Sequence, residues 1–413
     1  MNDVSKDLHR IRQHGAMEYS DPPVNLDAVR RYRIGRVRAE LKKRDYAGIV
    51  LFDQLNTRYA TDVTNMQIWC SHNENRYVFI AAEGPAIVFE YGAKAHLSEG
   101  ISTVDEVRPA RPWYYFVAGD RYLEQSKRWA AEIADLVHQH GGGNKRLAID
   151  RTGYDGIAAL MSHGIELFDG FEVMELARAI KSPEEIVLMR KAIEACDQGL
   201  DAMREALRPG ISENALLSKL HATNVALGGE WIETRLLASG RRTNPWFRES
   251  SMRPIEQGDM VSFDTDLIGP YGYCADISRS WICGEGKPSD EQRRLYALAV
   301  EQIEFNKALI KPGVSFREVS EKAWPMPAEF VPNRYGVIAH GVGLCDEYPC
   351  VYHQIDYDDM GYEGFIQEGM TVCVESYMGA TGGREGVKLE DQFLVTANGL
   401  KPLSTYPLEL DWL

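Results

Sequence analysis

The stretch FDTDLIGPYGYCADISRS (residues 263–280) sets three aspartates among apolar and small residues, and it decides how the chain is interpreted. In the segment MVSFDTDL (260–267), side chains alternate faces if the segment is a strand, so Asp264 and Asp266 share one face. Gly272 permits a turn, and a returning strand then brings Asp276 beside the first pair. The pattern predicts two adjacent antiparallel strands that present three carboxylates to one site.

Three further candidates follow in the second half of the chain. His340 lies in AHGVG (339–343), Glu375 in TVCVES (371–376) and Glu390 in KLEDQF (388–393). Five carboxylates do not share a protein interior unless cations neutralise them, because buried charge is costly and like charges repel. Oxygen-rich ligands with one imidazole suit two divalent first-row ions. The sequence therefore predicts a two-metal enzyme.

Length, composition and charge limit the classes of protein to which this chain can belong. A chain of 413 residues favours two domains, and 44% hydrophobic with 26% charged residues is typical of a globular protein. The net charge of −15 argues against nucleic acid and anionic membrane as partners. The N-terminal residues show no secretory signal, and no apolar run is long enough for a membrane span. Seven scattered cysteines without a CxxC pair indicate reduced thiols and a cytoplasmic location.

The order of predicted elements indicates two domains. After a polar arm (1–26), alternating helices and strands predict an α/β domain over residues 1–175, with helices at 27–44 and 121–140 and strands at 46–53 and 146–150. KSPEE (181–185) has an N-cap serine, a proline and a glutamate at the spacing of a capping box. It opens a second domain, 176–413, which is helical to 227 and then rich in strands, with one more helix at 290–310.

These motifs resemble the metallopeptidases of the pita-bread fold, which include methionine aminopeptidase, Xaa-Pro aminopeptidase and prolidase, with creatinase as a metal-free relative. The resemblance covers nearly the whole chain. It rests on KSPEEI (181–186), GYCADISRS (272–280), AHGVG, EGMTVCVES (368–376) and LEDQFLVT (389–396). It implies an α/β (α+β) fold class, with a creatinase-type N-terminal domain followed by a pita-bread catalytic domain.

Three positions depart from a peptidase. The first ligand motif of the peptidases is Asp-x-Gly, whereas Asp264-Thr265-Asp266 here adds a carboxylate. The loop SGRRTNPWFRES (239–250) lacks the peptidases' upstream histidine and has Trp246 and Phe247 instead. In DEYP (346–349), Asp346 replaces a second histidine. Amide hydrolysis needs donors for the oxyanion and the leaving amine, which imidazoles supply. A carboxylate base beside two Lewis acids instead suits proton abstraction next to a carboxylate, followed by elimination.

This pattern resembles one branch of the fold, the dimethylsulfoniopropionate lyases. The resemblance implies cleavage of that substrate to acrylate and dimethyl sulfide. By motif it implies Asp346 as the base, Tyr335 as a substrate contact and iron as the metal, although the ligand types would also accept zinc, manganese or cobalt. The implied ligands are Asp264, Asp266, Asp276, His340, Glu375 and Glu390.

The substrate is a small zwitterion whose sulfonium is a permanent cation. Aromatic faces bind such cations with roughly 0.5–2 kcal/mol per contact. Trp246 and Tyr335 are the candidate substrate-binding residues, with Phe247 beside them. The aromatic run 113–116 is a further candidate for the sulfonium, but core packing or a contact in a homodimer, the oligomer that the resemblance implies, is the favoured interpretation.

Three alternatives stay open at this point. The first is a dinuclear metallopeptidase of the Xaa-Pro aminopeptidase or prolidase type, which the missing histidines disfavour. The second is a creatinase-like hydrolase, which the complete ligand set disfavours. The third is a non-catalytic binding protein, which would not need to keep all six ligands.

Overall fold

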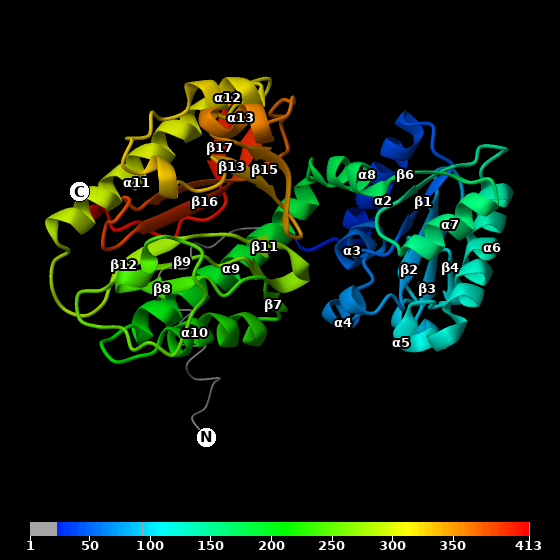
Figure 1. Ribbon diagram of the computed structural model, residues 1–413, viewed down its shortest axis with the longest axis horizontal. Coiled ribbons are helices and arrows are strands. Elements are labelled where there is room, and N and C mark those ends of the chain that lie inside the picture. Colours follow the sequence, from blue (N-terminus) through cyan, green and yellow to red (C-terminus); the bar gives the residue numbers. More distant parts are fainter. Residues whose placement is uncertain (1–22, 93, 413) are drawn as a thin grey trace. The chain divides into compact units, whose positions relative to one another are not determined.

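The computed structural model describes residues 23–92 and 94–412 (Figure 1). The chain forms two compact units, Asn25–Arg178 and a second that starts at Ala179. Of the polar arm predicted at 1–26, residues 1–22 lie outside the described residues, and Leu26 already begins the first described helix. None of the described helices is long and apolar enough to cross a membrane.

A six-stranded sheet forms the centre of the first unit, in the order β4-β3-β2-β1-β5-β6. The strands are β1 (Gly48–Leu51), β2 (Tyr77–Ala81), β3 (Ala86–Glu90), β4 (Glu106–Pro109), β5 (Arg146–Ile149) and β6 (Glu166–Asp169). β1 pairs antiparallel with β2 and parallel with β5, so the sheet is mixed. β1, β2 and β3 are buried along their whole length, as their continuous apolar sequences predict.

Helices cover both faces of this sheet. Figure 1 shows α6 (Tyr122–His140) and α7 (Tyr154–Ser162) on one side and α2 (Leu26–Lys43) and α8 (Gly170–Arg178) on the other. The shorter helices are α3 (Gln54–Thr61), α4 (Gln67–His72) and α5 (Tyr115–Ala118). Trp129 of α6 packs against Phe52 with the rings tilted and their centroids 5.7 Å apart, in the main apolar cluster of the unit. The predicted α/β organisation is confirmed here.

The aromatic run 113–116 divides between the core and the surface. Trp113 is buried with its ring centroid 5.7 Å from that of Trp129. Tyr115 and Phe116 are 65% and 79% exposed. The run therefore contains one core residue, Trp113, and two exposed aromatics, Tyr115 near Tyr122 and Phe116 stacked on Tyr114.

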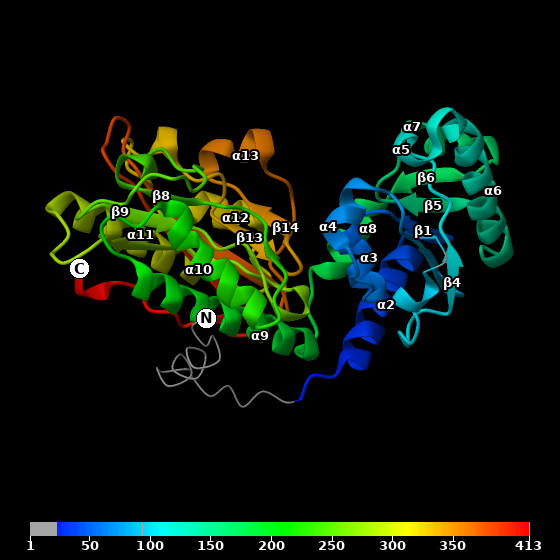
Figure 2. The same ribbon diagram turned by 90° about the horizontal axis from the view of Figure 1, so that it is seen from below.

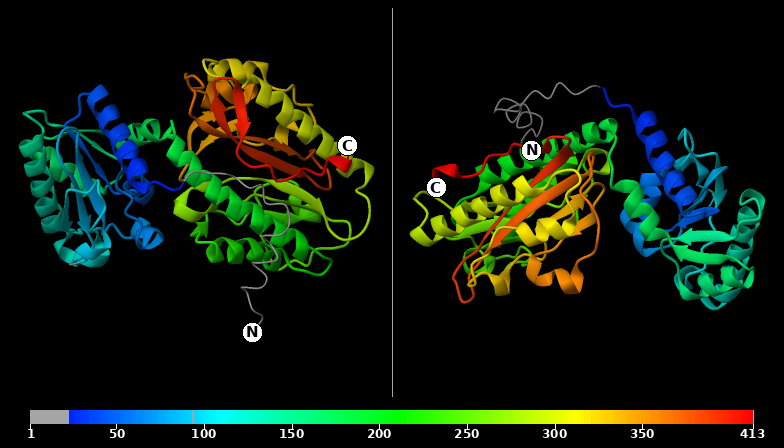
Figure 3. Two further views of the ribbon diagram at one scale, coloured as in Figure 1. Left: turned by 180° about the vertical axis from the view of Figure 1, so that it is seen from behind. Right: turned by 90° about the horizontal axis from the view of Figure 1, so that it is seen from above.

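Three antiparallel sheets build the second unit, in the orders β14-β13-β15-β16-β17, β12-β9-β8 and β11-β10-β7. Seen from below, α9 and α10 lie in front of the strands (Figure 2), and seen from above α11 does (Figure 3, right). The helices are α9 (Pro183–Ala206), α10 (Glu213–Ala226), α11 (Asp290–Leu309), α12 (Phe316–Lys322) and α13 (Gln354–Met360). The strands are β7 (Trp231–Ile232), β8 (Leu237–Ser239), β9 (Met260–Phe263), β10 (Leu267–Ile268), β11 (Cys274–Ala275), β12 (Arg279–Ile282), β13 (Ala339–Val342), β14 (Asp346–Val351), β15 (Thr371–Met378), β16 (Val387–Thr396) and β17 (Gly399–Pro402).

The capping box that opens α9 is confirmed. Ser182 Oγ accepts a hydrogen bond from the Glu185 backbone N–H at 3.1 Å, and Glu185 Oε2 accepts one from the Ser182 N–H at 2.9 Å. Pro183 occupies the first helical turn, where no backbone donor is required. The helix predicted at 290–310 is also present, as α11.

The prediction of one continuous strand over 260–267 is wrong. β9 ends at Phe263 and β10 begins at Leu267, so residues 264–266 lie between two strands of different sheets. Asp266 has a φ of 36°, in the left-handed region that strands do not use. The two aspartates therefore approach one site through a change of chain direction, and not through the period of a strand.

Candidate metal centre

The six predicted ligands come from separate segments of the second unit. Asp264 and Asp266 lie in the break between β9 and β10, and Asp276 lies between β11 and β12. His340 is on β13. Glu375 of β15 and Glu390 of β16 are direct cross-strand partners, so their side chains share one face of the five-stranded sheet. All six side chains are buried.

The structure brings these six residues into one cluster. Ligand atoms of Asp264, Asp266 and Asp276 lie within 4.8 Å of one another. His340 Nε2 is 3.2 Å from Glu390 Oε1, 3.4 Å from Glu375 Oε1 and 3.5 Å from Asp276 Oδ2. Asp276 thus belongs both to the all-carboxylate group and to the group around the imidazole. The six side chains together would offer enough ligand atoms to hold two ions.

The orientation of His340 suits a metal ligand. Its Nδ1 lies 3.0 Å from the Gly341 carbonyl oxygen, a partner that only an N–H can serve. A neutral imidazole with its proton on Nδ1 has its lone pair on Nε2, the atom that faces the carboxylates. Burial lowers the pKa of His340, but the surrounding carboxylates, Asp346 first, outweigh it and raise the pKa well above its ordinary value.

The electrostatics of the cluster call for added cations. Burial, followed by the charges of Glu390 and Asp266, raises the pKa of Asp276 well above its ordinary value. Burial and Glu390 also raise the pKa of Glu375 to about 8, although Lys388 opposes them. Asp276 Oδ1 is buried and has no hydrogen-bond partner among the described residues. Such an oxygen is costly unless it binds an ion, so the cluster fits metal.

Lys388 is the member of the cluster that the sequence reasoning missed. Its side chain is fully buried, and Nζ lies 2.6 Å from Glu390 Oε2, 2.9 Å from Glu375 Oε2 and 3.2 Å from Asp264 Oδ2. Burial lowers the pKa of Lys388, but Asp264, Glu390 and Glu375 outweigh it and hold the pKa well above the ordinary value. Two divalent ions and this ammonium together would balance the five carboxylates.

A signal for Lys388 was present in the sequence. In VKLED, Lys388 and Glu390 are two residues apart on β16, so their side chains point to the same face. Ser278, whose Oγ lies 2.8 Å from Lys388 Nζ, also donates to Asp264 Oδ1 at 2.7 Å. The alternation of strand residues therefore predicts that Lys388 shares a face with Glu390 once the strand is assigned, whereas its contact with Ser278 depends on the tertiary fold.

Asp346 lies at the start of β14, on the other side of the imidazole. Its Oδ1 is 3.7 Å from His340 Nδ1, and its side chain is 58% exposed. Loss of hydration beside the cluster raises the pKa of Asp346, and His340 opposes that shift. Asp346 is thus a solvent-accessible carboxylate next to a buried, acidic cluster.

The predicted aromatic contacts form a small group beside Lys388. Trp246 packs with Leu236 and Tyr377, and the half-buried Tyr335 lies against them. Lys388 Nζ lies 4.4 Å from the centroid of the Tyr335 ring. The exposed ring of Phe247 also lies beside Tyr335, with the two ring centroids 5.2 Å apart. The Trp246 indole N–H is buried and has no hydrogen-bond partner among the described residues.

The cysteines near the cluster differ in burial. Cys274 and Cys373 are buried, as expected of small apolar side chains, whereas Cys345 is only half-buried. Cys373 Sγ lies within 4.8 Å of ligand atoms of Asp276, His340 and Glu390, and it donates to the Asp276 carbonyl oxygen at 3.7 Å.

Residues 187–397 match metallopeptidase family M24, and residues 33–203 match the creatinase/prolidase N-terminal domain. The chain belongs to family M24. It is 43% identical over 390 residues to dimethylsulfoniopropionate lyase DddP of Roseovarius nubinhibens, covering 93% of this chain and 87% of the relative. It is 42% identical over 392 residues to the DddP of Roseobacter denitrificans, with the same coverage. The resemblance seen in the sequence is confirmed.

Solved M24 structures have the same fold. The prolidase of Pyrococcus horikoshii gives a TM-score of 0.73 at 23% identity, covering 92% of this chain and 99% of that chain. The Xaa-Pro dipeptidase of Bacillus anthracis gives 0.72 at 23% identity, covering 91% and 98%. The expected fold class, a creatinase-type domain followed by a pita-bread domain, is confirmed. M24 membership and the acidic cluster together support an enzyme with a dinuclear metal site.

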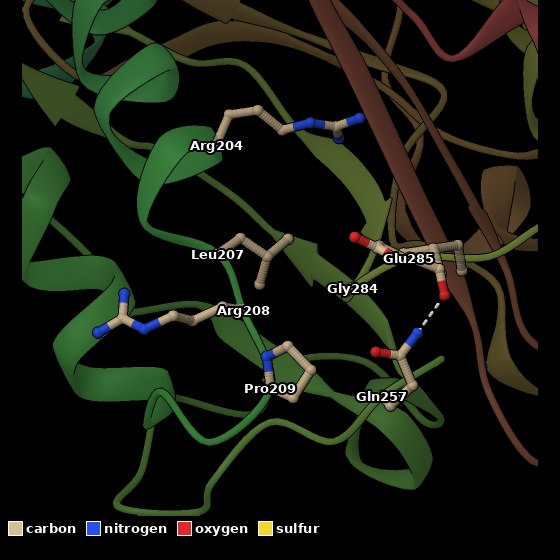
Figure 4. Close-up of a pocket in the computed structure, with 8 residues that line it drawn as sticks. Arg204, Leu207, Arg208, Pro209, Gln257, Gly284 and Glu285 are labelled. Carbon is tan, nitrogen blue, oxygen red and sulfur yellow. Dashed lines mark hydrogen bonds between the residues drawn. The ribbon is translucent and has the colours of Figure 1, made fainter.

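A pocket of about 560 Å³ elsewhere in the second unit shares no residue with this cluster (Figure 4). Its lining includes Arg204 and Arg208 near the end of α9 and Gln257, whose side-chain amide donates to the Glu285 carbonyl oxygen. Arg204 Nη1 already pairs with Glu409 Oε1 at 2.8 Å. The pocket is therefore mixed in polarity and has no excess of unpaired charge that would define a ligand.

Proposed function

We propose that this chain is a metal-dependent carbon–sulfur lyase that cleaves dimethylsulfoniopropionate to acrylate and dimethyl sulfide. The observation that carries the proposal is the identity of 43% over 93% of the chain to a protein named for this activity. The geometry supports it, because the accessible carboxylate of Asp346 lies beside the imidazole of a buried acidic cluster. An exposed carboxylate with a raised pKa is a suitable general base.

The residues that would hold two metal ions are Asp264, Asp266, Asp276, His340, Glu375 and Glu390. When bound, such ions act as Lewis acids that stabilise the negative charge that develops next to a carboxylate. Iron is the proposed metal, and zinc, manganese and cobalt are the alternatives that this ligand set accepts. Elemental analysis of protein purified without added metal would decide among them.

Asp346 is the proposed base. Its carboxylate takes a proton from the carbon next to the substrate carboxylate. The electron pair of that C–H bond forms the C=C bond of acrylate, while the C–S bond breaks and its electrons leave on dimethyl sulfide. Because the Asp346 side chain is 58% exposed, the proton can then pass to solvent.

Trp246 and Tyr335 are the proposed substrate contacts. Lys388 Nζ already lies over the Tyr335 ring, so part of that ring's capacity for a cation is in use. The Trp246 indole offers a buried N–H without a partner, and Phe247 offers an exposed ring next to Tyr335. We assign the sulfonium end of the zwitterion to this aromatic group and its carboxylate end to the two metal ions that the cluster would hold.

A homodimer is the proposed assembly, in a cytoplasmic setting. All seven cysteines are free, as a reducing compartment would keep them. Tyr115 and Phe116 are exposed aromatics of the kind enriched in interfaces. Light scattering after size-exclusion chromatography should give twice the mass of the chain, and Phe116→Ser should shift it toward the monomer. An unshifted mass would remove this surface from the interface.

The alternative is a dinuclear peptidase of the prolidase type. The fold supports it, since the solved neighbours are prolidases and dipeptidases. The site disfavours it, because His340 is the one imidazole in the described metal-ligating groups. His353, also buried, is near Asp356 and the Tyr335 backbone instead, and burial lowers its pKa to about 4.

The deciding experiment is headspace gas chromatography of purified protein given dimethylsulfoniopropionate, with acrylate measured in parallel. Equal amounts of dimethyl sulfide and acrylate, lost on chelation, support the lyase. A fully metallated sample that releases no dimethyl sulfide but cleaves an Xaa-Pro dipeptide would move the assignment to the peptidase.

A further inference from the structure

A buried ion pair joins two sequence motifs that the proposed mechanism leaves unused. Lys181 Nζ lies 2.7 Å from Glu347 Oε1, and the two side chains are 2% and 1% exposed. Lys181 precedes the capping-box serine of α9, and Glu347 directly follows Asp346 on β14. Burying a charge without an opposite charge nearby is costly, so a pair this deeply buried is not a by-product of a solvated surface.

The surrounding backbone is shaped for this pair. A Cβ atom placed on Gly343 would lie 1.6 Å from Glu347 Oε1, so only glycine leaves room for the carboxylate there. A Cβ on Gly341 would lie 2.3 Å from the Tyr348 carbonyl oxygen. The two glycines of AHGVG, expected to let backbone approach a ligand, thus admit β14 and its glutamate.

The start of α9 is also tied to segments that precede cluster residues. The Lys181 backbone N–H donates to the Gly369 carbonyl oxygen at 2.9 Å, just before β15, which carries Glu375. Tyr273, three residues before Asp276, donates through its hydroxyl to Glu185 Oε1 at 2.7 Å. The N-terminal turn of α9 is therefore a common anchor for three segments of the site.

Asp346 depends on this anchor more than the cluster residues do. Its side chain is 58% exposed, so packing contributes little to holding it. The ligands, by contrast, are buried and lie in or between paired strands. The direction of the Asp346 carboxylate is consequently set by its backbone, whose next residue is the buried Glu347.

We propose that Lys181 and Glu347 form a positioning pair that fixes the start of β14, so that the Asp346 carboxylate stands beside His340. This inference rests on the proposed function, in which Asp346 is the base. The pair itself touches neither substrate nor reacting atoms. It acts on the rate of proton abstraction through the placement of Asp346, and misplacement by about 1 Å costs on the order of 100-fold in rate.

The test uses Lys181→Met, Glu347→Gln and the double variant, each as full-length metallated protein. Each single variant removes one partner of a buried ion pair, so its melting temperature should fall. The double variant removes both charges, so its melting temperature should recover toward that of the wild type. Its kcat should nevertheless stay about 10- to 100-fold low, with KM nearly unchanged and two metal ions per chain. Lys181→Arg, which keeps the charge, should retain most of the activity.

A purely structural pair would give a different result. In that case kcat of the double variant would recover together with the melting temperature, and the proposal would be overturned. The matched control is Arg76→Met with Glu90→Gln, which removes a buried ion pair from the first unit (Arg76 Nη2 to Glu90 Oε1, 2.9 Å). It should leave kcat at the wild-type value. An equal loss of kcat in this control would also count against positioning.

A second readout separates this inference from the proposed function. If wild-type protein releases no dimethyl sulfide, the proposed function has failed, whatever the variants do. In that case the visible spectrum of cobalt-loaded protein tests whether Lys181 and Glu347 position Asp346, because the spectrum depends on the surroundings of His340. The double variant should show the same change as Asp346→Ala. A wild-type spectrum in the double variant would show that Asp346 has not moved.

Discussion

Buried charge is handled differently in the two units of this chain. In the first unit, Glu90 at the end of β3 accepts hydrogen bonds from Arg76 Nε at 3.1 Å and Arg76 Nη2 at 2.9 Å. One buried cation is therefore matched by one buried anion. In the second unit, four buried carboxylates lie within 3.5 Å of Lys388 or His340, and a fifth, Asp266, lies beside Asp264 and Asp276. Strands β1–β3 of the first unit and β9, β13 and β15 of the second are buried along their whole length, yet among the described residues the clusters of metal-ligating side chains all lie in the second unit.

That difference separates a structural ion pair from a binding site. In an ion pair, each charge is neutralised by its partner within the chain. Removing one partner therefore lowers the stability of the fold but affects no binding site. An excess of carboxylates is satisfied only by something the chain does not contain, and metal ions are what oxygen ligands of this kind hold. The predictions below test whether the two units differ in this way, ordered by their expected effect on turnover.

Metal removal should have the largest effect. Chelation should reduce release of dimethyl sulfide to background, a loss of about 10³-fold or more, because the Lewis acid stabilises the developing charge. The melting temperature should also fall, since ions that bind only the folded state stabilise it. Assays before chelation, after it and after metal is returned would check this. Full activity in metal-free protein would show that the acidic cluster of the second unit is not a catalytic metal site.

Replacement of the proposed base should come next. Asp346→Ala should lower kcat by about 10²- to 10⁴-fold, the usual contribution of a general base, while metal content stays at two ions per chain. Asp346→Asn serves as the control of similar shape, because it keeps the volume but cannot accept the proton. Turnover within about twofold of wild type in either variant would exclude Asp346 as the base.

The sequence predicted most of this arrangement for identifiable reasons. The apolar run at 46–53 marked the central strand β1 of the first unit, and the capping box at Ser182 and Glu185 marked the start of α9. Both are local signals that tertiary packing did not override. The six ligand candidates were found because charged residues interrupt apolar runs, and the structure brings all six together.

The errors arose where local periodicity stops. Asp264 and Asp266 were placed on one strand face, but the chain turns there and Asp266 takes a positive φ. Lys388 was overlooked because a single lysine in a strand is usually solvated, and its burial depends on Glu375 and Asp264, which lie far away in sequence. The Lys181–Glu347 pair likewise joins residues 166 positions apart, a contact that no local pattern encodes.

Lys388 gives a sharper test of the charge balance. Lys388→Met should destabilise the metal-free protein by about 3–5 kcal/mol, because the carboxylates around it lose their resident cation. Metal should recover part of this loss, since divalent ions partly replace the missing charge. Denaturant unfolding with and without metal would measure both effects. Lys388→Arg is the control that keeps the charge. Equal stability of the methionine variant and wild type without metal would show that Lys388 does not balance the cluster.

Arg76→Met should have the smallest effect on the site. It removes a buried cation from the first unit and leaves Glu90 unpaired, so it should cost about as much as Lys388→Met, roughly 3–5 kcal/mol in unfolding free energy. Metal content and kcat, measured well below the melting transition, should nevertheless match wild type, because the cluster keeps all its charges. The two variants lose the same kind of group, and only for the one inside the unbalanced cluster should metal narrow the stability difference from wild type. If metal narrowed that difference equally for Arg76→Met, the excess of carboxylate in the second unit would not explain the difference between the units.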